Sequence, residues 1–173
     1  CEQECALSCI SCGSNGCGGI CGNCSNGKIC APDQSQCLSP PPEDICATAE
    51  KVNAMPFTTL GDSSEALDNY SALGTDCVDA GTGGGADVAY VFTPSSTDVF
   101  QITLSELTFD ATLYVVSDCD QLSKTCLSGA DSLDDEMLQV GLQAGITYYI
   151  IVDGVDSQES GMFQLDISSL GAC

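Results

Sequence analysis

The fold class of this chain is most evident in one segment, LQAGITYYIIVDG, which spans residues 142–154. Residues 146–152 of this segment form a nearly uninterrupted run of β-branched and aromatic side chains. Such side chains favour strands, and a run that is apolar on both faces is typical of a strand buried on both sides. The segment therefore predicts a central strand in a sheet that is covered on both faces.

Further runs of similar composition lie before and after this segment, at spacings of about ten residues. Gly, Asp and Ser separate them, which indicates turns. They cover residues 89–93, 99–104, 111–116, 137–142 and 163–167. Short strands at such spacings are typical of an antiparallel sandwich. We therefore predict an all-β, jelly-roll-like antiparallel β-sandwich over residues 45–173, in which the segment 45–52 forms either a short helix or an edge strand.

The first 38 residues have a different composition. They contain nine of the 14 cysteines and very few large apolar side chains. A segment this short cannot offset its chain entropy by apolar burial, so cross-links must hold it. We predict a disulfide-rich, loop-dominated module over residues 1–38, joined to the sandwich by a proline-rich linker over residues 39–44. Disulfides persist in oxidising compartments, which predicts an extracellular or cell-surface location.

Zinc binding is the competing explanation for dense cysteine. Cys9/Cys12 and Cys21/Cys24 have the Cys-x2-Cys spacing of a zinc site, but other cysteines surround them and the chain contains no histidine. Disulfides are therefore the better explanation. Cys1 is either a lipid-anchored N-terminal cysteine or one more bridge partner, and the many nearby cysteines favour the bridge.

The cysteine count adds a constraint on pairing. Nine cysteines precede the linker and five follow it, so complete pairing requires at least one bridge that crosses the linker or leaves the molecule. Cys119 and Cys126 flank a short loop, and we predict that they pair locally. The partners of Cys46, Cys77 and Cys173 stay open.

Charge and composition exclude several classes of function. The net charge is −22, with three lysines and no arginine, which excludes a nucleic-acid-binding surface and disfavours anionic membranes. No run approaches the roughly 20 apolar residues of a transmembrane segment. Without histidine there is no Ser-His-Asp or Cys-His relay, and oxidised cysteines supply no thiolate. We therefore predict that the protein is not an enzyme.

The acidic residues instead favour calcium, which takes oxygen ligands from carboxylates and loop carbonyls. A first set combines the start of one strand with an acidic loop before another, and consists of Asp110, Asp131, Asp134 and Asp135. A second, weaker set follows the central strand and consists of Asp153, Asp156 and Glu159. The alternative is that these acids are solvated turn residues.

The pattern L-x-A-G-x-x-Y-Y-I-x-V-D-G at residues 142–154 resembles the bacterial pre-peptidase C-terminal (PPC) domain family, in the form found in secreted myxobacterial proteins. Further matching pieces lie at residues 44–46, 86–94 and 109–115 and in the loop of Asp131, Asp134 and Asp135. The resemblance implies a jelly-roll-like, non-catalytic β-sandwich that often binds calcium and accompanies another secreted domain. Residues 12–30 resemble short cysteine-rich modules found beside such domains.

Two functional hypotheses follow. The first is a structural or adhesive protein, calcium-stabilised and disulfide-locked, that self-associates or binds other surface proteins, as a subunit of an extracellular filament or coat does. The second is an accessory module that holds a polysaccharide or collagen-like ligand for a separate secreted enzyme. Its aromatic contacts would be Tyr70, Tyr90, Tyr114, Tyr148 and Tyr149, although strand positions favour the core for most of them. Asn23 and Asn69 also begin N-glycosylation sequons.

Overall fold

A computed structural model describes residues 13–14, 20–22, 29–30, 37–38, 42–72, 77–78 and 83–171. The chain divides into two compact units, Cys1–Pro41 and Pro42–Cys173. In the first unit, β1 (Gly13–Ser14) pairs with β2 (Ile20–Gly22), and β3 (Ile29–Cys30) pairs with β4 (Cys37–Leu38), both antiparallel. Cys37 is disulfide-bonded. Cys1, Asn23 and Cys173, to which the sequence assigns candidate roles, lie outside the described residues.

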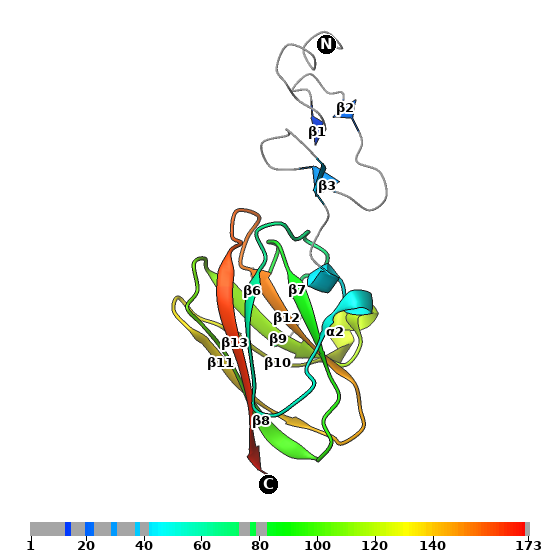
Figure 1. Cartoon of the computed structure of the whole chain (residues 1–173), viewed down its shortest axis with the longest axis vertical. Helices are drawn as coiled ribbons and strands as arrows, with labels where there is room; N and C mark the ends of the chain where they lie inside the picture. Colours follow the sequence, from blue (N-terminus) through cyan, green and yellow to red (C-terminus); the bar gives the residue numbers. More distant parts are fainter. Residues whose placement is uncertain are drawn as a thin grey trace. The chain divides into compact units, whose positions relative to one another are not determined.

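The second unit is a sandwich of two sheets (Figure 1). The described strands of the five-stranded sheet follow the order β10-β9-β12-β7-β5, and those of the four-stranded sheet the order β11-β8-β13-β6. Their bounds are β5 Glu50–Lys51, β6 Phe57–Asp62, β7 Val88–Phe92, β8 Asp98–Ser105, β9 Ala111–Val116, β10 Cys126–Asp131, β11 Glu136–Leu142, β12 Tyr148–Gly154 and β13 Met162–Gly171. Neighbouring strands are antiparallel except for the parallel pair of β5 and β7. The all-β sandwich predicted from the sequence is confirmed.

Residue alternation explains how the two sheets meet. In β11, residues 136, 138, 140 and 142 are buried and the residues between them are exposed, which is the period-two pattern of a half-buried strand. β8 and β13 alternate in the same way. By contrast, β12 lies between β9 and β7 and is buried along almost its whole length, as its unbroken apolar run predicts.

The core between the sheets is aromatic in its centre. The rings of Phe92 and Phe100 meet edge to face with their centroids 5.0 Å apart, and those of Tyr90 and Phe163 do so at 6.4 Å. Phe163 lies opposite Gly61 in the register of β13 and β6. A Cβ atom on Gly61 would lie 2.2 Å from Cζ of Phe163, so the glycine makes room for the ring.

The outer face of the five-stranded sheet is also covered. Ala89, Tyr114 and Ile151 on this face pack with Ala49 and Ala72, which belong to the segments that precede β5 and β7. We call these covering segments the cover. Two disulfides, Cys46–Cys119 and Cys77–Cys126, attach the cover to the edge of the sheet. The cover therefore gives β12 a second buried face.

The predicted Cys119–Cys126 pair is wrong. Residues Cys119–Gln121 form the 3-10 helix η3, and residues Leu122–Thr125 form the one-turn helix α2. Asp118 caps η3 by accepting a hydrogen bond from the backbone N–H of Asp120. This helical connection, unlike the simple loop that the prediction assumed, presents each cysteine to a different covering segment.

Smaller differences concern the ends of the cover. Segment 45–52 contains both of its predicted alternatives, since Cys46–Thr48 forms the 3-10 helix η2 and Glu50–Lys51 forms the edge strand β5. Pro42–Asp44, assigned to the linker from the sequence, forms the 3-10 helix η1 within the second unit. Asp44 is buried there because its carboxylate accepts hydrogen bonds from the backbone of Leu67 and the side chain of Asn69.

Candidate functional site

The structure divides the first predicted calcium set. Asp110 has Asp131 as an electrostatic neighbour, because β9 and β10 form an antiparallel pair that ends near these residues. Asp134 and Asp135 are exposed and line a different hollow with Glu106, Leu107 and Phe109. Residues 128–131 also belong to strand β10, although the sequence suggested a continuous acidic loop there. Among the described residues, no three acidic or cysteine side chains converge as a metal-binding group.

The second predicted set is divided as well. Glu159 accepts a hydrogen bond from the backbone N–H of Asp110 at 3.0 Å, and Asp156 is another electrostatic neighbour of Asp110. Burial and then the carboxylates of Asp131, Glu159 and Asp156 raise the pKa of Asp110. Asp153, in contrast, is fully buried on the outer face of the five-stranded sheet. In the folded chain Asp110 of the first set therefore lies near Asp156 and Glu159 of the second. Asp153 lies apart from these three residues.

Glu136 is a buried carboxylate that neither predicted set includes. It is fully buried, and its Oε1 accepts a hydrogen bond from the backbone N–H of Ser132 at 2.8 Å. Its Oε2 has no hydrogen-bond partner within the described residues. Burial raises its pKa, the two hydrogen bonds from Ser132 oppose this effect, and the carboxylates of Asp131 and Asp110 add to it. The sequence held one signal for the burial of Glu136: it is the first residue of a strand whose alternate residues face the core.

Asp87 and Asp153 form the most unusual polar group in the sandwich. Asp87 directly precedes β7 and Asp153 lies near the end of β12, in positions that the pairing of Val88 with Val152 makes adjacent. Both carboxyls are fully buried, and Oδ1 of each has no hydrogen-bond partner among the described residues. Thr112, opposite Asp153 on β9, is also fully buried, and the described part of the chain offers its hydroxyl no partner. Buried polar atoms without partners are rare in folded proteins, so several beside one another indicate a missing ligand or proton.

The other oxygen of each carboxyl, Oδ2, accepts hydrogen bonds from the protein. Oδ2 of Asp87 accepts the backbone N–H groups of Asn69 and Tyr70 at 2.7 and 2.8 Å. Oδ2 of Asp153 accepts the hydroxyl of Tyr114 at 3.1 Å. One oxygen of each carboxyl is therefore fixed by these hydrogen bonds, while the other has no hydrogen-bond partner in the part of the chain that the structure describes.

Both carboxyls titrate far above their ordinary range. Burial raises the pKa of Asp87 to about 8, against the opposing effect of the Tyr70 and Asn69 N–H groups, and Asp153 and Asp68 raise it further. Burial likewise raises the pKa of Asp153 to about 7, opposed by the Tyr114 hydroxyl and the Gly85 N–H. The charged groups that act on them are other carboxylates, which make the ionised form still less favourable.

Close backbone contacts hold the loops around Asp153. A Cβ atom on Gly154 would lie 2.0 Å from the carbonyl oxygen of Glu159, and one on Gly85 would lie 2.5 Å from that of Asp156. The backbone N–H groups of Gly84 and Gly85 both donate to the carbonyl of Gly154. The glycines thus let the 83–85 segment and the 154–159 loop pack together over the end of β12.

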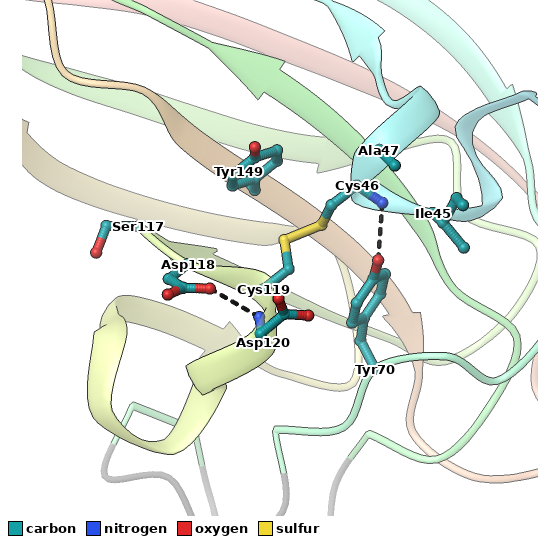
Figure 2. A pocket seen from close by; sticks show the side chains of 9 residues that line it. All are labelled: Ile45, Cys46, Ala47, Tyr70, Ser117, Asp118, Cys119, Asp120 and Tyr149. Atoms are coloured by element: carbon teal, nitrogen blue, oxygen red, sulfur yellow. Dashed lines mark hydrogen bonds between the residues drawn. A yellow bond between two sulfur atoms is a disulfide. The ribbon is translucent and has the colours of Figure 1, made fainter.

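A second feature of the outer face is an open pocket beside the Cys46–Cys119 disulfide, with a volume of about 540 Å³. In the view of Figure 2 the disulfide lies between the rings of Tyr70 and Tyr149. The lining residues are Ile45, Cys46, Ala47, Tyr70, Ser117, Asp118, Cys119, Asp120 and Tyr149. The pocket and the buried acidic pair are linked through Tyr70. This residue lines the pocket, and its backbone N–H donates a hydrogen bond to Asp87.

The five tyrosines predicted as aromatic contacts differ in how deeply they are buried. Tyr90, Tyr114 and Tyr148 are buried, whereas Tyr70 and Tyr149 are half-buried. Only the latter two line the pocket.

The sequon residue Asn69 is engaged in the fold. Its Nδ2 donates hydrogen bonds to the backbone and the side chain of Asp44, each at 3.0 Å. A glycan on Nδ2 would disturb both bonds.

Among the described residues, no helix is both long and apolar enough to cross a membrane. No protein-family model matches the sequence, and no curated protein matches it.

Several solved structures are similar to this chain. The pre-peptidase C-terminal domain of a collagenase from Bacillus anthracis has 15% identity and a TM-score of 0.47, with 69% of this chain and 94% of that chain covered. PliG, a periplasmic inhibitor of g-type lysozyme from Aeromonas hydrophila, has 13% identity and a TM-score of 0.47, covering 70% and 95%. The CBM35 of Abf62 from Cellvibrio japonicus has 11% identity and a TM-score of 0.36, covering 66% and 95%. At these levels the likeness carries no conclusion about ligand, and membership of the PPC family stays a prediction.

Proposed function

We propose that this chain is a non-catalytic, extracytoplasmic structural or adhesive module, a disulfide-locked β-sandwich that calcium stabilises by binding beside Asp87 and Asp153. The observation that carries the proposal is the pair of fully buried carboxyls, each held through one oxygen and without a partner on the other among residues 42–72, 77–78 and 83–171. A carboxylate buried without compensation is costly, so a bound cation would remove the largest unfavourable feature of this interior.

The donor types suit calcium better than a softer metal. Calcium takes six to eight oxygen ligands, and carboxylates, hydroxyls and backbone carbonyls all serve. Besides the two Oδ1 atoms, the neighbouring Thr112 hydroxyl also lacks a partner among the described residues. Calcium would supply positive charge here and no redox chemistry. Asp87, Asp153 and Thr112 would hold it, and neutral oxygens or water would complete its coordination.

The absence of histidine and the location of the acidic pair both support a non-catalytic role. The chain contains no histidine, and both members of the acidic pair are fully buried and do not line the open pocket. The two disulfides of the sandwich support an oxidising compartment. The net charge of −22 opposes close packing of copies, so a cation that lowers this charge would also favour assembly into a filament or coat.

The test is a thermal melt in millimolar calcium and in chelator. Calcium at about one hundred times its Kd stabilises the native state by about 2.7 kcal/mol, which raises the Tm by roughly 5–10 °C for a domain of this size. Asp153→Asn and Asp87→Asn are each expected to reduce the calcium-induced rise, whatever their own Tm. Asp134→Asn is the matched control, since it makes the same carboxyl-to-amide change at an exposed position.

Sodium chloride at equal ionic strength is expected to leave the Tm of the wild type unchanged, because screening does not fill a coordination site. Identical melting of the wild type in calcium and in chelator would contradict the proposal.

A further inference from the structure

The pocket beside the Cys46–Cys119 disulfide combines two aromatic rings with carboxylates. Tyr149 stands on the outer face of β12, and Tyr70 comes from the covering segment (Figure 2). Asp118 and Asp120 enter from the start of η3, and Ser117 adds a hydroxyl. The pocket has a volume of about 540 Å³ and opens to solvent, so a side chain or a small ligand can enter it.

The charges around this pocket have one sign. The described residues that line it include two acidic residues and no basic one. The pKa of Tyr70 is raised by burial, and the carboxylates of Asp87, Asp120 and Asp44 contribute, which places further negative charge behind the ring. An anionic ligand would be repelled here, and a neutral one would gain nothing from the two carboxylates. A cation is attracted both by the carboxylates and by the π faces of the tyrosines.

The walls of the pocket are fixed before any ligand arrives. The hydroxyl of Tyr70 accepts the backbone N–H of Cys46 at 2.7 Å, and Asp87 binds the backbone N–H of Tyr70. The disulfide joins η2 to η3, and one oxygen of Asp118 accepts the backbone N–H of Asp120 at 2.9 Å. A preformed site loses less conformational entropy on binding, so it can hold a single side chain usefully.

We propose that this pocket binds the side chain of a lysine or arginine from a basic segment of a partner protein. The aliphatic stem of such a side chain would lie against Tyr70 and Tyr149, and its charged end would meet Asp118 and Asp120. The partner would be basic, because a molecule with a net charge of −22 attracts cationic chains over a distance. This site adjoins the acidic pair through Tyr70, whose backbone N–H donates to Asp87, but different side chains would hold its ligand.

The test is a titration of isotope-labelled protein with a short Gly-Lys repeat peptide, followed by NMR. We expect shifts confined to the pocket residues, and loss of binding when the lysines of the peptide are acetylated. The double variant Asp118→Asn/Asp120→Asn is expected to weaken binding by about tenfold, as the loss of two charged partners implies. Asparagine retains the capping function at position 118, so η3 is preserved.

The matched control is Asp134→Asn/Asp135→Asn, which changes the net charge equally at an exposed loop outside the pocket. Equal weakening in both double variants would attribute the binding to overall charge and overturn the proposal. Binding of a neutral oligosaccharide in place of the lysine peptide would overturn it as well. The peptide is expected to bind in chelator as well, and this result distinguishes the pocket from the calcium site, which binds no metal under that condition.

Discussion

Replacing Cys46 and Cys119 together by serine is expected to lower the free energy of unfolding by about 4 kcal/mol. The two cysteines are 73 residues apart, so their bond removes a large closed loop from the freedom of the unfolded chain. The same bond holds η2 over the outer face of the sheet, where Ala49 and Tyr70 pack against Tyr114 and Ile151. Denaturant titration followed by circular dichroism measures the effect.

The comparison is the double serine variant of Cys77 and Cys126, which are 49 residues apart. Because loop entropy depends only weakly on length, its loss of stability is expected to be similar, at about 4 kcal/mol. A loss below about 1 kcal/mol for either pair would show that the cover is held by packing alone.

Phe163→Ala is expected to cost about 3–5 kcal/mol of stability, as aromatic truncations in well-packed cores do. The side chain is only 1% exposed, and its ring meets both Tyr90 and Phe109 edge to face with centroids 6.4 Å away. Met162→Ala is the control, since its side chain is 56% exposed on the neighbouring position of the same strand. It is expected to change stability by no more than about 0.5 kcal/mol.

Gly61 supplies a double-mutant cycle for the same contact. Gly61→Ala alone places a methyl group against the Phe163 ring and is expected to destabilise the sandwich by about 1–3 kcal/mol. In the Phe163→Ala background its cost is expected to fall, because the ring that it would meet is gone. Additive losses in the same denaturant titration would contradict this account of the glycine.

The fold could be predicted where the strands carry a clear pattern. β8, β11 and β13 alternate between buried and less buried residues, and β12 begins with an unbroken apolar run over residues 148–152, so each was recognisable from its sequence pattern. β6 and β10 were missed for a physical reason. Both are edge strands of their sheets, and their sequences, FTTLGD and CLSGAD, include turn-forming Gly and Asp. β11 is also an edge strand, but it alternates strictly, so the Gly and Asp residues of β6 and β10 are what made these two resemble turns.

The candidate site was predictable only where it depends on local pairing. Asp110 and Asp131 were expected to meet, and the hairpin of β9 and β10 makes them electrostatic neighbours. Asp87 and Asp153 are brought together by the pairing of β7 with β12, which are far apart in sequence. No spacing rule specifies which distant strands pair, so the acidic pair could be found only in the folded chain.

The cysteines illustrate the same limit. A short separation suggested that Cys119 and Cys126 pair, but the helical connection between them directs each to a covering segment from an earlier part of the chain. Disulfide connectivity depends on Cβ directions in the folded chain, which a count of intervening residues does not contain.

The most direct test of the central claim is terbium luminescence, with the lanthanide as a luminescent substitute for calcium. The chain has no tryptophan, and the hydroxyl of Tyr114 lies 3.1 Å from Oδ2 of Asp153, so an ion bound beside Asp153 would receive excitation from this tyrosine. We expect terbium emission on tyrosine excitation in the wild type, its displacement by calcium, and its loss in Asp153→Asn and in Tyr114→Phe, with Tyr149→Phe unchanged. Emission that persists at full strength in both Asp153→Asn and Tyr114→Phe, or no emission in the wild type, would contradict a cation site at the buried acidic pair.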